Sequence, residues 1–129
     1  MSDTSAVLVT GVSGQVGQSL FRWSNQHPGY KFTFPSSEEL NLANPKSIDK
    51  FFVTHKFDVI INCAAYTAVE KAESEPELAN QLNHLAVGQL AETANKQQAK
   101  LINISTDYVF SGMSYKPYVE DDVVDPQCV

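Results

Sequence analysis

The sequence predicts an α/β fold with a doubly wound parallel sheet, in which helices cover both faces. Short apolar runs rich in Val, Ile and Phe alternate with segments whose apolar residues repeat at helical spacing. A glycine-rich turn joins the first apolar run to the first helical segment. The resulting order, β-α-β-α-β-α-β, requires right-handed crossovers between parallel strands. We expect residues 1–129, about the size of one domain, to form only the N-terminal portion of such a fold.

The bounds of the elements follow from the same patterns. We expect strands at residues 6–10, 31–34, 57–62 and 101–105, and helices at residues 15–26, 45–55 and 76–97. The second helix has a clear start, because Asn44 can cap its N-terminus and Pro45 suits the first helical position. The third strand is almost continuously apolar, as expected for a strand that is covered on both faces. From Ser111 onward the sequence is acidic and irregular.

The composition is that of an ordinary globular protein, with 43% hydrophobic and 19% charged residues. The net charge of −6 argues against nucleic-acid binding, because phosphate neutralisation needs clustered Lys and Arg. No apolar run reaches the roughly 18 residues of a membrane span. The polar start Met1–Ser5 is unlike a secretory signal, so we expect a cytoplasmic location. Cys63 and Cys128 lack metal-ligand spacing, and we expect two free thiols and no metal site.

The most informative segment joins the first strand to the first helix and carries a G-x-x-G-x-x-G pattern. Gly11 permits a tight turn, Gly14 lets a pyrophosphate approach the backbone, and Gly17 lets the helix pack closely on the sheet. Gln15 and Val16 lie in the first helical turn, whose free N–H groups and positive dipole end favour an anion. The pattern therefore predicts a Rossmann-type dinucleotide site. It lacks the Lys and Ser/Thr of a P-loop, which disfavours nucleotide hydrolysis.

The residues after the second strand leave the choice between NAD and NADP open. No carboxylate that could hold the ribose 2′-hydroxyl of NAD occurs before Glu38. Ser36 and Ser37 could hydrogen-bond a ribose 2′-phosphate, which favours NADP weakly. They could equally cap a turn before Glu38 and Glu39, and both interpretations fit the sequence.

Three further segments are characteristic in their order and spacing, namely Asn62–Glu77 (NCAAYTAVEKAESEPE), Leu82–Asn83 and Ile104–Gly112 (ISTDYVFSG). With the glycine pattern they resemble the extended short-chain dehydrogenase/reductase family, and within it the reductases that make dTDP-L-rhamnose. The resemblance covers the chain from Val7 to Val129. It implies NADPH- or NADH-dependent reduction of the 4-keto group of dTDP-4-dehydro-6-deoxy-L-mannose. It also implies a homodimer when full-length, and Mg²⁺ at the dimer interface of some relatives.

The same resemblance assigns site residues. The residues that it places along the cofactor, beyond the glycine loop, are Asn41, Leu42, Ala64, Ala65, Tyr66, Thr67 and Ile104. Asn41 stands where many relatives have an Asp that holds the adenine amino group, and its carbonyl oxygen can accept the same bond. A turn residue is the alternative for Asn41. Thr106, the candidate catalytic residue, corresponds to the hydroxyl that hydrogen-bonds the sugar carbonyl, and Asp107 corresponds to a substrate contact. A strand-end hydroxyl that is bonded locally is the alternative for Thr106.

The charged run from Glu70 to Glu77 has two interpretations. We favour a solvated segment that places acids near the start of the long helix over direct contact with substrate. His84 is interpreted as a packed or surface histidine. Asn83 corresponds to a helix asparagine that stabilises the active site in this superfamily, and an ordinary structural role is equally compatible with the sequence.

The family's proton donor is the Tyr of a Tyr-x-x-x-Lys pair, in which the Lys lowers the phenol pKa from about 10. None of the five tyrosines has Lys four positions later, and Pro126–Val129 ends where relatives continue to that Tyr. We therefore expect a truncated chain that is inactive in turnover and, alone, unstable or self-associating. The alternatives are a nucleotide-sugar epimerase or dehydratase of the same family, and a non-catalytic nucleotide-binding regulatory subunit.

Overall fold

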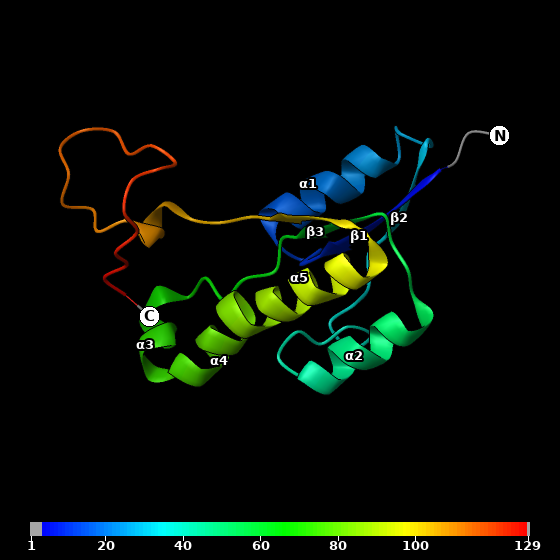
Figure 1. The fold of residues 1–129 in the computed structure, drawn as a ribbon, viewed down its shortest axis with the longest axis horizontal. Coiled ribbons are helices and arrows are strands. Elements are labelled where there is room, and N and C mark those ends of the chain that lie inside the picture. Colours follow the sequence, from blue (N-terminus) through cyan, green and yellow to red (C-terminus); the bar gives the residue numbers. More distant parts are fainter. Residues whose placement is uncertain (1–3, 129) are drawn as a thin grey trace.

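Four parallel strands form the centre of the molecule, a computed structural model that describes residues 4–128 (Figure 1). The strands are β1 (Ser5–Thr10), β2 (Tyr30–Thr33), β3 (Val59–Asn62) and β4 (Lys100–Asn103). They pair in the order β2-β1-β3-β4, and every pair is parallel. Two parts of the sequence considered above, Met1–Asp3 of the polar start and Val129 at the end, lie outside the described residues.

The direction of winding reverses at β1. The chain leaves β1 towards β2 on one side, then crosses back to reach β3 and β4 on the other side. Where the winding reverses, the connections at the carboxyl ends of two neighbouring strands diverge and leave a crevice. In this sheet the crevice belongs to β1 and β3, which pair directly.

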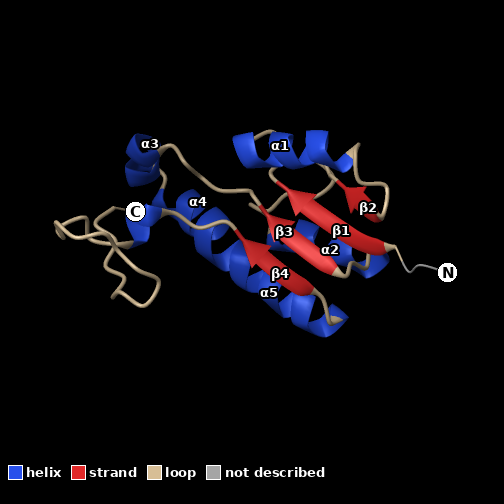
Figure 2. Cartoon of the chain, turned by 90° about the horizontal axis from the view of Figure 1, so that it is seen from above, coloured by secondary structure: helices blue, strands red, loops and turns tan. Residues whose placement is uncertain are grey.

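The helices lie on both faces of the sheet. They are α1 (Gln15–Ser24), α2 (Pro45–Thr54), α3 (Val69–Ser74), α4 (Pro76–Asn80), the π-helical turn η1 (Gln81–Leu85), α5 (Ala86–Gln97) and the 3-10 turn η2 (Asp107–Val109). Figures 1 and 2 show α1 on one face and α2 and α5 on the other, with α3 and α4 beyond the carboxyl ends of the strands. This arrangement confirms the predicted Rossmann-type fold. Within residues 4–128, no helix combines the length and apolar character needed to cross a bilayer.

The core lies between the sheet and the helices α2 and α5. Leu8 pairs in register with Ile60, and both are fully buried, as are Ile48 of α2 and Leu90 of α5. Burying side chains of this size contributes about 1.5–3 kcal/mol each. Alternate side chains of a strand face the same side of a sheet, so Leu8 and Ile60, which are in register, both point towards α2 and α5. The core therefore holds β1 and β3 rigidly where their carboxyl ends meet.

The structure adds to the sequence prediction in two places. The charged run from Glu70 to Glu77 is exposed except at Ala72, as expected, but it folds into α3 and the start of α4. Residues 76–97 are helical throughout, as predicted, and η1 is a π-helical turn within that helix. In α3 only Ala72 is buried, so the segment has no apolar stripe that could reveal a helix in the sequence. The predicted start of α2 is confirmed, since the Asn44 side chain accepts a hydrogen bond from the Lys46 amide.

Candidate functional site at the carboxyl edge of the sheet

The carboxyl ends of three neighbouring strands meet at one edge of the sheet. Thr10 of β1 pairs in register with Asn62 of β3, and Asn62 pairs with Asn103 of β4. The loops that follow these residues carry most of the site residues predicted from the sequence. Ligands of doubly wound α/β proteins bind at this edge, outside the switch point.

Gly11 and Gly17 are required by the packing of the loop after β1. Gly11 has a positive φ of +72°, and a Cβ atom there would lie 2.5 Å from the Ala64 nitrogen. At Gly17, a Cβ atom would overlap the Gly11 carbonyl oxygen and lie 2.7 Å from the Val12 Cα atom. The first glycine therefore lets β1 approach the loop after β3, and the last lets α1 approach its own loop.

Gly14 differs from these two glycines because the space beside it is open. A Cβ atom there would meet only the Gly11 carbonyl oxygen, at an ordinary 3.5 Å. Gly14 is the N-cap of α1, and no side chain caps the N–H groups of the helix start at Gln15 and Val16. The Gln18 side chain also holds the loop, since its Nε2 donates to the Val12 carbonyl oxygen at 2.8 Å. Open space in front of uncapped amides fits a diphosphate group.

The loop after β3 forms the other wall of this site. It runs from Cys63 through Ala64 and Thr67 to α3, without regular secondary structure. The Asn83 side chain of η1 holds its middle, because Asn83 accepts from the Tyr66 amide at 2.8 Å and donates to the Tyr66 carbonyl oxygen at 3.1 Å. Cys63 is a half-buried free thiol, and desolvation raises its pKa, which keeps it neutral.

The Tyr66 side chain is fixed as well as its backbone. Its hydroxyl donates a hydrogen bond of 2.5 Å to the Glu75 carboxylate, at the junction of α3 and α4. This bond is the main reason why the pKa of Tyr66 is raised, with smaller contributions from desolvation and the Glu75 charge. The phenol therefore stays protonated and remains a donor. This contact is not predicted by any local pattern, because Tyr66 and Glu75 are nine positions apart in the sequence.

A chain of polar side chains links the strand ends beneath the loops. The Thr10 hydroxyl donates to the Asn62 side-chain oxygen at 2.5 Å. The Asn62 side-chain nitrogen then donates to the Asn103 side-chain oxygen at 2.7 Å. Thr10 and Asn62 are almost completely buried. Hydrogen bonds between buried polar groups fix one geometry, because leaving either group unpaired would be costly. A polar residue at the end of each strand is the signal that could have revealed this network, but the predicted fourth strand ran past Asn103 to residue 105.

Thr106 and Asp107 follow β4 at the same edge. The Thr106 hydroxyl accepts from the Tyr108 amide at 3.2 Å and donates to the Asp107 carboxylate at 3.3 Å. Both residues are exposed, as is Ile104, so they are accessible to a ligand. Asp107 also borders a cavity of about 290 Å³ with residues of the C-terminal segment. The local bonds of Thr106 match the alternative of a strand-end hydroxyl, and its catalytic role remains a prediction.

The segment after β2 is occupied by its own turns. The Asn41 side chain accepts from the Ala43 amide at 3.0 Å, which leaves one lone pair of its oxygen for another donor. Leu42 is buried in the core, so its side chain faces away from solvent. The Ser36 hydroxyl bonds both the amide and the carboxylate of Glu39. These contacts support turn roles for Asn41 and Ser36, and they leave the adenine contact a prediction.

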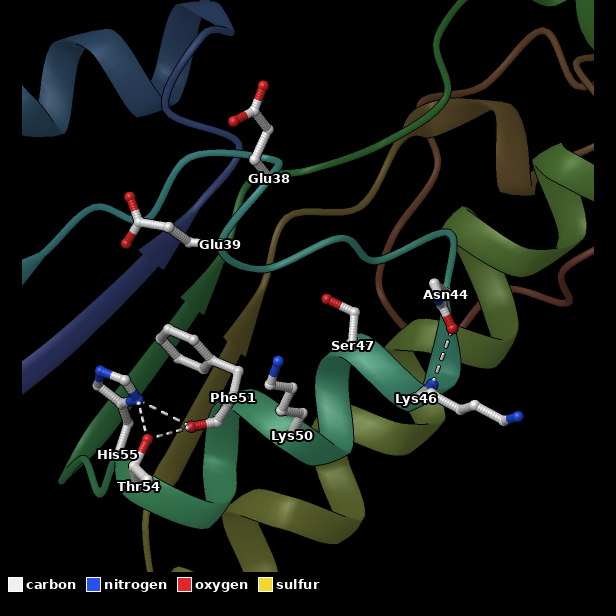
Figure 3. A pocket seen from close by; sticks show the side chains of 9 residues that line it. All are labelled: Glu38, Glu39, Asn44, Lys46, Ser47, Lys50, Phe51, Thr54 and His55. Atoms are coloured by element: carbon white, nitrogen blue, oxygen red, sulfur yellow. Dashed lines mark hydrogen bonds between the residues drawn. The ribbon is translucent and has the colours of Figure 1, made fainter.

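A cavity of about 570 Å³ lies elsewhere, between the segment before α2 and α2 itself (Figure 3). It is lined by residues of both charges, namely Glu38, Glu39, Asn44, Lys46, Ser47, Lys50, Phe51, Thr54 and His55. None of the site residues predicted from the sequence lines it. His84 is exposed and its ring shares a hydrogen bond with the Asn80 side chain, in agreement with a surface histidine. Among residues 4–128, no group of three or more His, Cys, Asp or Glu could hold a metal ion.

The family model described as the RmlD substrate binding domain matches residues 5–129. The chain belongs to this family. A curated member, the dTDP-4-dehydrorhamnose reductase of Salmonella typhimurium, is 40% identical over 93% of the chain. A solved structure of dTDP-4-dehydrorhamnose reductase from Bacillus anthracis, in complex with NADP, superposes with a TM-score of 0.89 at 32% identity, over 98% of the chain.

The relatives of this chain have different names. The methionine adenosyltransferase 2 subunit beta of Rattus norvegicus is another relative, 37% identical over 93% of the chain. The chain spans less than half of each relative: 41% of the Salmonella protein, 37% of the rat protein and 44% of the Bacillus anthracis chain. The family and its fold are therefore established for these residues. The activity of the whole protein is not fixed by membership alone.

Proposed function

We propose that this chain supplies the NADPH- or NADH-binding part of an enzyme that reduces dTDP-4-dehydro-6-deoxy-L-mannose at its 4-keto group to give dTDP-L-rhamnose. The observation that carries the proposal is the open space at Gly14 in front of the uncapped start of α1. Packing accounts for Gly11 and Gly17, whereas it does not account for Gly14. A Bacillus anthracis relative named dTDP-4-dehydrorhamnose reductase, with NADP bound, supports the cofactor class and the sugar substrate.

The residues of the site have separate roles in this proposal. The amides at Gln15, Val16 and Gly17 would hold the diphosphate, which suits an acidic protein because backbone dipoles replace basic side chains. The loop of Ala64, Ala65, Tyr66 and Thr67 would line the cofactor together with Ile104, and Asn41 and Leu42 would lie at its adenine end. When bound, the nicotinamide supplies a hydride.

On the sugar side, Thr106 would donate a hydrogen bond to the carbonyl oxygen, where negative charge develops during reduction. Asp107 would contact the sugar nucleotide beside it. The five tyrosines of the chain lack a Lys four positions later, so the proton donor is not assigned to any of these residues. The whole protein would act as a cytoplasmic homodimer.

A second function is favoured by a specific observation. A relative that is 37% identical is named a beta subunit of methionine adenosyltransferase 2, so the relatives of this chain include proteins named as subunits. A nucleotide-binding regulatory subunit would need the same glycine loop but no proton donor. Turnover of the sugar nucleotide by the whole protein separates the two functions, because a regulatory subunit would bind the dinucleotide without reducing the sugar.

The cofactor part of the proposal is tested by titrating the chain with NADPH and NADH. Trp23 is the single tryptophan and lies near the C-terminal end of α1, so energy transfer from its indole to a bound reduced nicotinamide, and not direct contact, reports on binding. We expect a saturable change and a higher melting temperature with at least one dinucleotide. The variant Gly14→Ala should fold, because its Cβ atom has room, but it should bind at least ~10-fold more weakly because the methyl group enters the ligand space.

Gly88→Ala is the matched control. Gly88 lies in α5 with open space around it, and the same methyl group there should leave affinity unchanged. Two results would contradict the proposal: no response of the unchanged chain to either dinucleotide, or equal affinities of Gly14→Ala and the unchanged chain.

A further inference from the structure

The loop after β3 depends on side-chain contacts for its conformation. Residues 63–68 form no regular secondary structure, and Ala65 and Thr67 are exposed. Ala64 at its start lies against Gly11, since a Cβ atom on Gly11 would be 2.5 Å from the Ala64 nitrogen. A displacement of this loop would therefore change the shape of the glycine loop and of the site between them.

Asn83 fixes the loop at one residue only. Both of its bonds go to the backbone of Tyr66, one to the amide and one to the carbonyl oxygen. The side chain of Tyr66 provides the second attachment, because its hydroxyl donates to the Glu75 carboxylate at 2.5 Å. The Glu75 bond therefore adds a restraint on the Tyr66 side chain to the two hydrogen bonds that Asn83 makes to the Tyr66 backbone.

Glu75 is itself held in place by the helices on both sides of it. Its amide donates to the carbonyl oxygens of Lys71 at 2.8 Å and Ala72 at 3.2 Å, which ends α3. Its carbonyl oxygen accepts from the Ala79 amide at 3.1 Å, which begins α4. The carboxylate thus projects from a rigid junction, although the side chain is exposed and takes no part in the core. Such a carboxylate can restrain another segment without supporting the fold.

We propose that Glu75 is a positioning residue for the dinucleotide site, which holds the Ala64–Thr67 loop against the glycine loop through the Tyr66 hydroxyl. The inference rests on the proposed cofactor site and adds to it a residue outside the strands and loops that line the ligand. Glu75 does not touch the cofactor in this arrangement. By ordering the loop before the ligand binds, Glu75 lowers the dissociation constant of the dinucleotide.

Four variants and one control test the inference in the full 129-residue chain. Glu75→Ala and Tyr66→Phe each remove the bond, and each should weaken NADPH or NADH binding by about 3- to 10-fold, the effect of one hydrogen bond. The double variant should be no weaker than either single variant, because both changes remove the same interaction. Glu75→Gln keeps an acceptor and should restore affinity to within about twofold. Glu77→Ala, which removes a neighbouring acid of α4, is the matched control and should bind normally.

Amide hydrogen exchange of residues 64–68, measured without ligand, tests whether the Tyr66–Glu75 hydrogen bond orders the loop, independently of cofactor binding. We expect faster exchange in Glu75→Ala than in Glu77→Ala or Glu75→Gln, at an unchanged melting temperature. Equal exchange in all three variants, or additive losses of affinity in the double variant, would overturn the inference. A chain that binds neither dinucleotide would overturn the proposed function instead, while the exchange comparison would still establish or refute the Glu75 contact.

Discussion

Gly14 and Gly17 lie three residues apart, yet an added methyl group would meet quite different surroundings at the two positions. At Gly17 it would collide with the backbone of the same loop, whereas at Gly14 it would project into open space. The spacing of the glycines predicted both roles from the sequence, because a helix that starts at a fixed distance from a strand has few ways to pack. Gly17 is thus required by the packing of the fold, whereas packing leaves the space beside Gly14 open.

Gly17→Ala should destabilise the chain by about 2–3 kcal/mol, because the backbone of Gly11 and Val12 cannot move aside without disturbing β1. Urea unfolding measures the change. The same substitution at Gly88, in an exposed part of α5, should leave stability unchanged or raise it by up to about 1 kcal/mol. Equal midpoints for Gly17→Ala and the unchanged chain would show that the loop can relax around the methyl group.

Other single-residue roles could not be predicted from the sequence. Glu75 belongs to a run of acids whose members look alike until α3 and α4 place one of them beside Tyr66. Ser36 suited two roles equally, and only its bonds to Glu39 favour the turn. Roles of this kind depend on contacts between separate elements, and the spacing of residues in the sequence does not predict such contacts.

At the scale of elements, the start of α2 is the clearest case of local control. Asn44 adopts an extended conformation, and its side chain accepts from the Lys46 amide at 3.0 Å (Figure 3). Pro45 then occupies the first helical turn, where its missing N–H group is not needed. These features were predicted because capping depends only on neighbours in the sequence.

Asn44→Ala should therefore destabilise the chain by about 1 kcal/mol, since an amide at the helix start loses its acceptor. Asn44→Ser retains an acceptor of similar capping strength and should cost only a few tenths of that amount. Thermal unfolding of the two variants, followed by the helical circular dichroism signal, makes the comparison. A loss as large for Ser as for Ala would mean that Asn44 acts through its other neighbours rather than as a cap.

The helix of residues 76–97 was predicted with its observed bounds, but it contains a feature that local signals do not predict. Residues 81–85 form a π-helical turn within it. Such turns are rare and often lie at functional sites. Here the turn carries Asn83, whose two bonds to Tyr66 connect it to the loop after β3. The π-helical turn thus coincides with a tertiary contact, which apolar residues at helical spacing do not predict.

At the scale of the whole molecule, the sheet is covered unevenly. Figure 2 shows α1 over β1 and β2, while β3 and β4 carry no helix on that face within residues 4–128. Ile61 pairs in register with Ile102 there, and Ile102 is 42% exposed and Ile104 45% exposed. Strand alternation places Ile102 and Ile104 on the same side of β4, because side chains two residues apart face the same side. Contiguous apolar patches of this kind promote association.

We expect the 129-residue chain to self-associate through this face at micromolar concentrations, because pairing two such patches removes apolar surface from water. Ile102→Thr should raise the monomer fraction measured by sedimentation velocity across a concentration series. Val53→Thr is the matched control, since Val53 is 81% exposed on α2, outside this face of the sheet, and should leave association unchanged. A chain that stays monomeric at every concentration, or equal effects of the two substitutions, would show that the uncovered face of β3 and β4 does not drive association.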